Sequence, residues 1–323
     1  MYAGKMARPL RIQFSGALYH VVSRGNERRG IVRDDKDRER RVEWLQRTVE
    51  KHGWRLHAFV LLPAREHLFF ETPQANLSTG MHFLNGSYTG YFNRRHKRSG
   101  HLFEGRFKGH LIEGSGYYLQ VSRYIHRLPL QARLTKRVED YSWSSFPGYR
   151  RAKHALDWVC YDTVLGELQV GANRARRAYA RFVCDADDQR CASPFVDAVG
   201  DFVLGSSDFV ERIRRLIEAT SEDSAVPQRQ HFRRRPSLAQ IVKVVAQHFG
   251  ADPGAWRVGT RHNDQSRAIA AYLARRDYLY GAKEIAEVLG YRSHGSVRSA
   301  VLRLEKSDNR YRTDLKKLRS LLT

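Results

Sequence analysis

Four segments in the first 130 residues are short, apolar and rich in aromatic and β-branched side chains. Such segments are typical of β-strands when turn residues border them. Two of the segments follow each other closely and are separated only by the tight connection at Pro63-Ala64-Arg65. The pattern therefore predicts four strands, at residues 16–25, 54–63, 66–72 and 101–114.

The segments between these strands favour helices. Residues 34–53 begin with acidic side chains, end at a glycine and repeat their valine and leucine residues at helical spacing. Residues 76–97 and 115–132 are expected to form two further helices. The predicted order is β-α-β-β-α-β-α. This is the ferredoxin-like arrangement of an α+β domain, an antiparallel sheet with helices on one face.

The rest of the chain is predicted to be helical, and 323 residues are enough for two separate cores. Helical periodicity is clearest at residues 238–250, 266–277, 282–290 and 294–306. We expect a first domain at residues 8–150, a helical region without an indicated role at 156–220, a polar linker at 221–236, and a helical domain at 237–323.

The charge of the chain is strongly positive. It contains 57 Lys and Arg against 34 Asp and Glu, a net charge of +23, and its pI is near 10.3. Residues 1–155 hold 29 of the basic and 13 of the acidic residues, so most of the excess lies on the predicted first domain. Such an excess favours a polyanionic partner, because cationic side chains neutralise phosphates and release counterions. Nucleic acid is the expected partner.

Cysteine content and hydropathy exclude several classes of protein. The three cysteines, Cys160, Cys184 and Cys191, are odd in number and lack C-x-x-C spacing, which argues against a disulfide framework and a zinc site. No apolar run approaches the roughly 18 residues of a membrane span. The first residues lack the apolar core of a signal peptide. We expect a cytoplasmic protein, close to the nucleoid in a bacterium.

Several long motifs of the first domain resemble one known family. They are PLRIQFSGALYHVVSRGNERRGIVRDDKDRERRVEWL, WRLHAFVLLP, LNGSYTGYFNRRHKRSGHLFEGRFKGHLIE and SRYIHRLPLQARL. Together they resemble the REP-associated tyrosine transposases, which are single-tyrosine HUH transposases acting on single-stranded DNA. The resemblance covers roughly residues 8–150.

The resemblance implies a set of catalytic roles. In the family, a tyrosine hydroxyl attacks a DNA phosphodiester and forms a 5′-phosphotyrosine intermediate. A divalent metal, Mg²⁺ or Mn²⁺, polarises the phosphate. Two histidines at positions i and i+2 of a strand hold the metal, and a polar residue one turn after the tyrosine adds a ligand. The tyrosine corresponds to Tyr124 here, and the second histidine corresponds to His67.

This sequence departs from the family at the metal ligands. Arg65 stands where the family has the first histidine, and Leu128 stands where it has an asparagine. A unit charge at about 4 Å from another costs roughly 4 kcal/mol at an effective dielectric of 20, and a divalent ion doubles that cost. We therefore expect a nuclease whose activity is impaired. If the chain is active, the expected cofactor is Mg²⁺ or Mn²⁺, with His57 as the candidate replacement ligand. If it is inactive, no cofactor is expected.

Two roles are open for Arg65 itself. Its guanidinium could hold a DNA phosphate directly through two parallel hydrogen bonds. Alternatively, it pairs with a nearby acid, Glu66 or Glu104. Because alternate strand residues face opposite sides, Glu66 is expected to face away from Arg65 and His67.

A basic segment at residues 93–110 completes the expected surface of the first domain. Cations are interleaved there with His96, Phe103 and Phe107, a combination that suits single-stranded DNA, whose backbone is neutralised while its bases stack. A solvated run of charges is the alternative interpretation. The expected DNA-binding residues of this domain are Arg24, Arg28, Arg29, Arg65, Arg94, Arg95, Lys97, Arg98, Arg106 and Lys108.

The C-terminal helices resemble a second family. SRAIAAYLARRD and AKEIAEVLGYRSHGSVRSAVLRLE resemble the DNA-binding domain of the replication initiator DnaA, where a helix-turn-helix precedes an Arg-Asp-His-Thr-Thr-Val signature. Ser293 and Gly295 replace two residues of that signature, so a different target sequence is expected. A helical bundle for protein contact is the alternative. The expected contacts with duplex DNA are Arg292, His294, Ser296 and Arg298 in the major groove, with Arg267 on the backbone.

Three functional hypotheses follow from the sequence. The first is an active single-strand DNA transposase that nicks and joins through Tyr124. The second is a non-catalytic DNA-binding protein that recognises a hairpin or repeat, and it is favoured by Arg65 and Leu128. The third is a regulator that binds RNA hairpins, since small basic ferredoxin-like domains also bind RNA. No feature of the sequence favours a monomer or a dimer.

Overall fold

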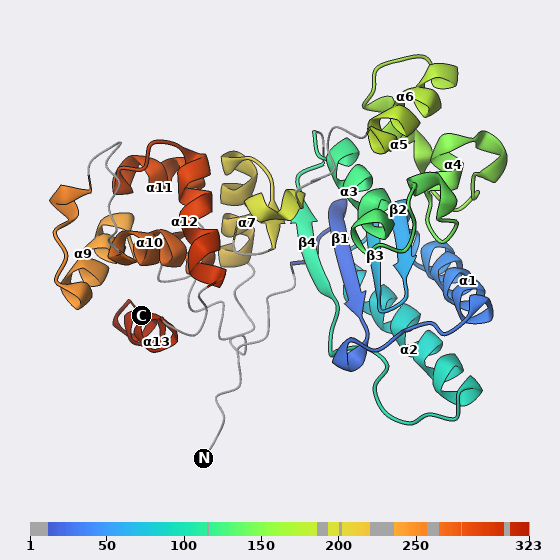
Figure 1. Ribbon diagram of the computed structural model, residues 1–323, viewed down its shortest axis with the longest axis horizontal. Helices are drawn as coiled ribbons and strands as arrows, with labels where there is room; N and C mark the ends of the chain where they lie inside the picture. Colours follow the sequence, from blue (N-terminus) through green and yellow to red (C-terminus); the bar gives the residue numbers. More distant parts are fainter. Residues whose placement is uncertain are drawn as a thin grey trace. The chain divides into compact units, whose positions relative to one another are not determined.

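The computed structural model describes residues 12–114, 116–185, 193–199, 202–219, 236–256, 265–278, 280–306 and 311–322. The chain divides into two compact units after Pro194. We call residues 12–194 the N-terminal unit and the described residues from Phe195 onward the C-terminal unit (Figure 1). This boundary falls inside the segment 156–220, which we predicted from the sequence to be one helical region.

The N-terminal unit is built on an antiparallel sheet. Its strands β1 (Ala17–Arg24), β2 (Arg55–Leu62), β3 (Arg65–Thr72) and β4 (Lys108–Ile112) lie in the order β2-β3-β1-β4, and every adjacent pair is antiparallel. The predicted α+β class and strand order of the ferredoxin-like arrangement are confirmed. Strand β4 is shorter than the predicted strand at residues 101–114.

Helices α1 (Asp35–His52) and α2 (Leu77–Arg95) pack together on one face of the sheet (Figure 1). The Asp34 side chain accepts a hydrogen bond from the Asp37 amide and caps the start of α1, which ends at Gly53 with a positive φ of 63°. Gly80 of α2 lies against the Trp54 ring, where a Cβ atom would stand 2.1 Å from a ring carbon.

Helix α3 (Tyr118–Gln131) lies on the opposite face of the sheet. Glu66 of β3 bonds to Arg41 of α1, whereas its neighbour His67 contacts Tyr124 of α3. Since adjacent strand residues point to opposite faces, α1 and α3 cover different faces. The expectation of helices on one face was therefore wrong. The continuous burial of β2 agrees with this, because a strand covered on both sides is apolar throughout.

Three further helices follow α3 in the N-terminal unit. They are α4 (Phe146–Arg150), α5 (Tyr161–Gly166) and α6 (Ala172–Cys184), and all three contact one another or α3. Because α5 and α6 lie after residue 156, part of the region without an indicated role is integral to the N-terminal unit.

Short 3₁₀ turns occur in both units. They lie at Asn26–Arg28, Val138–Asp140, Ala152–His154, Pro194–Asp197 and Pro253–Ala255.

The C-terminal unit is mainly helical and has its own apolar core, which includes Ile241, Ile269, Leu289 and Val297. A Ser237–Gln240 capping box starts its helix α9. The predicted linker at 221–236 lies outside the described residues except for Pro236. The elements are β5 (Val203–Leu204), α7 (Ser207–Ala219), α9 (Leu238–Phe249), α10 (Gln265–Tyr272) with a π-helical turn (Leu273–Asp277), α11 (Ala282–Leu289), α12 (His294–Lys306) and α13 (Arg312–Leu321).

The sequence patterns at 238–250, 282–290 and 294–306 match α9, α11 and α12 closely. Helix α13 was not predicted. In the part of the chain that the structure describes, no helix combines the length and the apolar character needed to cross a membrane.

Candidate nucleic-acid interface

Tyr124 lies beside His67, as the resemblance implied. The tyrosine projects from α3, and the edge of its ring faces His67 of β3 at a centroid distance of 6.3 Å. A second histidine, His20 of β1, faces the same ring at 6.1 Å. The helix on this face of the sheet therefore brings one tyrosine to two histidines from adjacent strands.

The histidines form a hydrogen-bonded row across three strands. His67 Nδ1 lies 3.0 Å from His20 Nε2, and His20 Nδ1 lies 3.4 Å from His110 Nδ1 of β4. Burial lowers the pKa of His67 to about 3, helped by the charge of Arg65, and lowers that of His110 to about 4. The pKa of His20 is also well below its usual range because of burial. All three rings are therefore neutral at pH 7.

Sequence reasoning missed His20 and His110. Each lies at an ordinary strand position, and nothing in the local pattern sets it apart from a packed histidine. Only the strand register brings them together, because His20 lies opposite Phe69 on one side and opposite His110 on the other. The one signal in the sequence was a histidine within an apolar strand. Only the register of β1 with β3 and β4 shows that this histidine shares the face of His67.

Arg65 shares the face of His67 and stands at the start of β3. Its side chain is exposed and makes no hydrogen bond or ion pair within the described ranges. Glu66 points the other way, as expected, and forms a buried pair with Arg41 in which Nη2 and Oε2 are 2.6 Å apart. Glu104 lies 3.7 Å from Arg24. Both acids weighed as partners of Arg65 thus pair with other arginines.

The residues around Tyr124 do not fit a divalent metal. Leu128, at the position of the family's third ligand, is buried and offers no donor atom. The cation Arg65 occupies the position of the first ligand. His57 packs its ring against Phe69 and Tyr118, with Nδ1 3.4 Å from the Cys160 carbonyl oxygen. Among the described residues, no three His, Cys, Asp or Glu side chains are placed to hold one ion.

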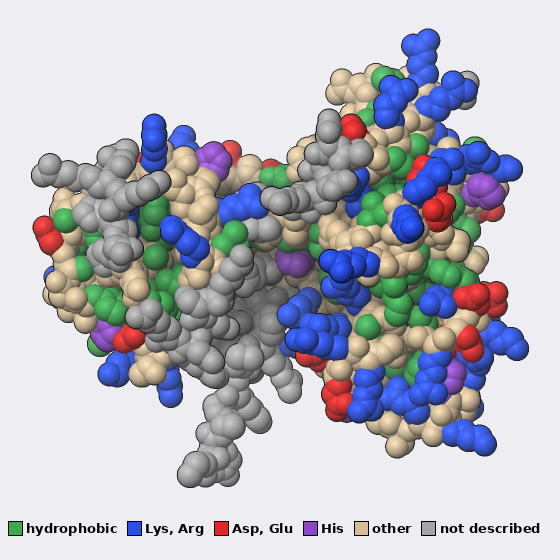
Figure 2. All heavy atoms as spheres, viewed as in Figure 1, with side chains coloured by type: hydrophobic (Ala, Val, Ile, Leu, Met, Phe, Trp, Pro, Cys, Tyr) green, Lys and Arg blue, Asp and Glu red, His purple; other side chains and the backbone are tan. Residues whose placement is uncertain are grey.

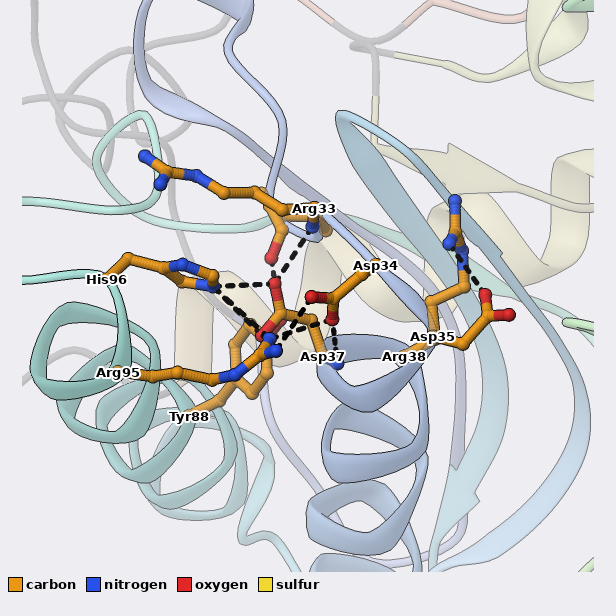
Figure 3. A network of polar contacts seen from close by, with 9 residues as sticks. Arg33, Asp34, Asp35, Asp37, Arg38, Tyr88, Arg95 and His96 are labelled. Carbon is orange, nitrogen blue, oxygen red and sulfur yellow. Dashed lines mark hydrogen bonds and ion pairs between the residues drawn. The ribbon is translucent and has the colours of Figure 1, made fainter.

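Some of the expected DNA-binding cations have acidic partners instead. Figure 3 shows Arg95 at the end of α2, where its guanidinium bonds both oxygens of Asp34 at 2.7 Å and also pairs with the fully buried Asp37. His96 Nε2 lies 2.8 Å from the same Asp37 carboxylate. Arg95 therefore joins α2 to the start of α1, which is a structural role that the sequence did not indicate.

The other cations expected to bind DNA differ in whether they have a partner within the protein. Arg29 pairs with Glu27 at 2.7 Å, and the Arg98 guanidinium lies 5.6 Å from the centre of the Phe92 ring. Figure 2 shows Lys and Arg side chains spread over the visible face of this unit. Within the described ranges, seven of the expected cations of this unit make no side-chain hydrogen bond or ion pair: Arg28, Arg65, Arg94, Lys97, Arg98, Arg106 and Lys108.

Two of the three aromatic side chains expected to stack on DNA bases, Phe103 and His96, are engaged within the protein. Phe103 is 8% exposed and belongs to a core cluster with Ile31 and Tyr88. His96 is held by Asp37 and packs on Phe92 with the ring centres 4.4 Å apart. The interleaved aromatic pattern thus reflects packing beneath the cations, and the expectation of base stacking on these two rings was wrong.

Helix α6 holds the back of the tyrosine helix. His126 of α3 is fully enclosed, with Nδ1 2.8 Å from the Tyr179 hydroxyl and Nε2 2.8 Å from the Ser145 hydroxyl. Arg127 donates to the carbonyl oxygens of Val183 and Asp185 at 2.6 and 3.0 Å, at the end of α6. The residues that follow Tyr124 are therefore fixed by a helix outside the motifs of the family resemblance.

The C-terminal unit places most of its expected contacts at the start of α12. Arg292 and His294 are exposed, while Ser296 and Arg298 are half-buried. The Ser293 hydroxyl lies 3.3 Å from the Ser296 amide and caps the helix. These residues follow a tight turn after α11, which ends at Gly290 with a φ of 70°.

Arg267 does not belong to that surface. It is 6% exposed, its guanidinium donates to the Gly290 carbonyl oxygen, and it lies 4.1 Å from the centre of the Tyr291 ring. It fixes the turn between α11 and α12 from within. A contact of Arg267 with the DNA backbone, as expected from the sequence, does not agree with this burial.

Comparison with known proteins relates the N-terminal unit to transposases. The sequence model of the family described as "Transposase IS200 like" matches residues 13–128. A solved structure described as "Structure of the REP associates tyrosine transposase bound to a REP hairpin" is 17% identical, with a TM-score of 0.41, and the match covers 48% of this chain and 91% of that chain. No curated protein matches the chain.

The part of the N-terminal unit that carries the tyrosine and the histidines is thus similar in sequence to transposases. Residues 13–128 match the sequence model of the IS200-like transposase family, and the chain is similar to that family over this segment. The matched segment contains β1 to β4, α1, α2 and the part of α3 that carries Tyr124. It ends before α4, α5 and α6, and it does not include the C-terminal unit.

Proposed function

We propose that this protein binds single-stranded or hairpin DNA through its N-terminal unit and has lost the cleavage activity of its family. One observation carries the proposal: Arg65, which is exposed and has no acidic partner among the described residues, stands two positions before His67, and the His67 ring contacts Tyr124. A cation at that place attracts a phosphate and repels a metal. The protein thus keeps a DNA-binding scaffold and lacks the ligand set for a Lewis acid.

The charge of the N-terminal unit supports binding. Seven cations of the set expected for this unit have no acidic partner among the described residues, and the binding of DNA phosphates would release counterions from the nucleic acid. A DNA-binding role also implies a location in the bacterial cytoplasm at the nucleoid. Arg95 and Arg267 are left out of the proposed contact surface, because each is engaged within the protein.

We further propose that the C-terminal unit binds duplex DNA with the start of α12. Arg292 and His294 are exposed there, and the preceding turn is fixed by Arg267. A helix presented in this way after a short turn can enter a major groove and place its first residues on base edges. Arg292→Ala is expected to weaken duplex binding without changing hairpin binding by the N-terminal unit.

The proposal is tested with a labelled single-stranded hairpin taken from the flanks of the protein's own gene. We expect the wild-type protein to bind this hairpin in the presence of Mg²⁺ or Mn²⁺ and to form no covalent adduct, as seen in a denaturing gel. An RNA hairpin of the same sequence should compete weakly. Strong competition by the RNA would favour the RNA-binding hypothesis instead.

Two variants separate the causes of any result. An adduct formed by the wild-type protein and absent from Tyr124→Phe would show that the nuclease is active with other ligands, and the proposal would fail. Cleavage gained by Arg65→His, with Tyr124 intact, would trace the loss of activity to one side chain. Tyr124→Phe should leave hairpin binding close to that of the wild type.

A further inference from the structure

The strand register gathers three cations at one end of the sheet. Arg24 lies directly opposite Arg65 in the β1–β3 pair, and Lys108 lies opposite Val22, two positions from Arg24 along β1. Since side chains alternate, all three share the face that carries His67 and His20. We call Arg24, Arg65 and Lys108 the cation cluster.

The cation cluster is unfavourable without an anion. Like charges directly opposite each other in an antiparallel pair destabilise the sheet. Glu104 offsets part of the charge, but its oxygen is 3.7 Å from Arg24 Nε and both side chains are about half exposed, at 47% and 57%. Within the described ranges, Arg65 and Lys108 have no acidic partner. The cluster therefore keeps an excess of positive charge.

A buried polar atom beside Tyr124 also lacks a partner. His67 is 3% exposed, and its Nε2 makes no hydrogen bond among the described residues. A buried ring nitrogen without a hydrogen bond is costly, so a bound group that supplies one is favoured. Arg65 stands two positions before this ring in β3 and on the same face of the sheet.

The row of histidines decides what this nitrogen can do. Each neutral ring carries one N–H, so the two hydrogen bonds of the row can run in either direction. In one direction His67 Nε2 carries the proton and donates. In the other it is a bare acceptor, the form that a metal needs. A neighbouring phosphate oxygen favours the donating form, because it can accept that hydrogen bond.

We propose that the cation cluster binds one phosphate of the DNA backbone beside Tyr124 and takes the place of the divalent metal. Arg65 holds the phosphate through its guanidinium, Arg24 and Lys108 add charge, and His67 Nε2–H donates a hydrogen bond. This rests on the proposed DNA-binding function and adds that binding at the tyrosine is independent of metal. Guanidinium charge is permanent, so chelation does not remove it.

The test couples one phosphate to one arginine. The gene-flank hairpin, with its single-stranded extension, is prepared as a series in which each linkage in turn is an uncharged methylphosphonate. Affinities are measured by fluorescence anisotropy with EDTA and with Mn²⁺. For the wild-type protein we expect one linkage whose neutralisation weakens binding about tenfold, the scale of a lost charged hydrogen bond.

Arg65→Ala should weaken binding of the unmodified hairpin by about the same factor. Neutralising the sensitive linkage should then weaken binding much less than it does in the wild type, because the main partner of that phosphate is already gone. Arg94→Ala is the matched control, because this exposed cation lies at the end of α2, outside the cluster. The decreases in binding free energy caused by Arg94→Ala and by neutralising the linkage should therefore be additive. Wild-type affinity should be equal in EDTA and Mn²⁺.

Two results would overturn the inference while leaving the proposed function standing. One is that neutralising the sensitive linkage weakens hairpin binding by Arg65→Ala as much as it weakens binding by the wild type. The other is wild-type binding that is lost in EDTA and restored by Mn²⁺. If the wild type binds no hairpin at all, the proposed function fails together with the inference.

Discussion

Two neighbouring arginines at the end of α2 differ completely in their surroundings. Arg94 is exposed and has no ion pair among the described residues, whereas Arg95 bonds Asp34 and the fully buried Asp37 (Figure 3). Sequence reasoning gave both the same role, because both lie in one basic run. Their separate roles depend on α1, which supplies the acids from about 60 residues away along the chain.

This difference predicts opposite effects of two matched substitutions. Arg95→Ala should lower the melting temperature by several degrees, since it removes the permanently charged partner of the buried Asp37. Hairpin affinity per folded molecule should change little. Arg94→Ala should leave the melting temperature unchanged and weaken hairpin binding. Calorimetry and anisotropy on both variants test this, and a reversed pattern would refute the assignment.

His126 makes stability depend on pH. Its burial lowers the pKa to about 3 in the folded state, against an ordinary value of 6.5. Between these values the unfolded chain takes up a proton that the folded chain does not. The free energy of unfolding therefore has its full value above pH 6.5. It falls by up to about 1.4 kcal/mol per pH unit as the pH falls toward 3.

His126→Gln removes this titration. The variant should be less stable than the wild type at pH 7, because Tyr179 or Ser145 loses a hydrogen-bond partner. The difference in free energy of unfolding should shrink between pH 6.5 and pH 4.5, in a series of urea titrations. A difference that stays constant with pH would show that His126 does not titrate in this way.

At the scale of the elements, helix α6 gives part of the region after residue 156 a definite role. It forms hydrogen bonds with the consecutive residues His126 and Arg127 of α3, and the guanidinium of Arg123 lies 4.4 Å from the centre of its Phe182 ring. The tyrosine helix is thus held between the sheet on one side and α6 on the other. This packing uses residues beyond the segment that matches the transposase family.

Arg127→Met tests the hold of α6 on α3. Methionine keeps an apolar stem of similar length but leaves the carbonyl groups of Val183 and Asp185 without their charged donor. We expect a loss of about 2 kcal/mol in the free energy of unfolding. Amide hydrogen exchange should rise in α6 and the end of α3, with α1 as the internal control. Equal exchange throughout would contradict a local role.

The elements also show how far sequence patterns reach. Helix α1 was predicted closely because its cap, its acidic start and its terminal glycine are local signals. Strand β4 came out shorter than predicted, since residues 101–107 include a core phenylalanine and a turn glycine that resemble a strand in composition. The face covered by α3 could not be predicted, because both faces of the sheet are buried and neither is marked as the outer one.

On the scale of the whole molecule, the chain consists of two units with separate cores. Their proposed ligands differ: hairpin or single-stranded DNA for the N-terminal unit and duplex DNA for the C-terminal unit. Two binding modules on one chain can act together through their effective concentration on a shared DNA molecule.

A fragment of residues 12–194 is expected to fold alone and to bind the hairpin with the affinity of the full chain. It should lose duplex binding, which should persist in the full-length Arg65→Ala variant. The reason is that the boundary after Pro194 keeps β1 to β4 and α1 to α6 together. Thermal melting and anisotropy test this; a fragment that folds but fails to bind the hairpin would assign part of the site to the C-terminal unit.

The sequence by itself determined the order of the elements and the α+β class, and its resemblance to a family singled out Tyr124 and His67. It also predicted that Glu66 and Arg65 point to different faces of the sheet, because the alternation of side chains along a strand is a local property. Tertiary structure alone decided that Arg24 faces Arg65, that His20 and His110 join His67, and which arginines have acidic partners. These depend on register and helix packing between distant segments, which no local pattern encodes.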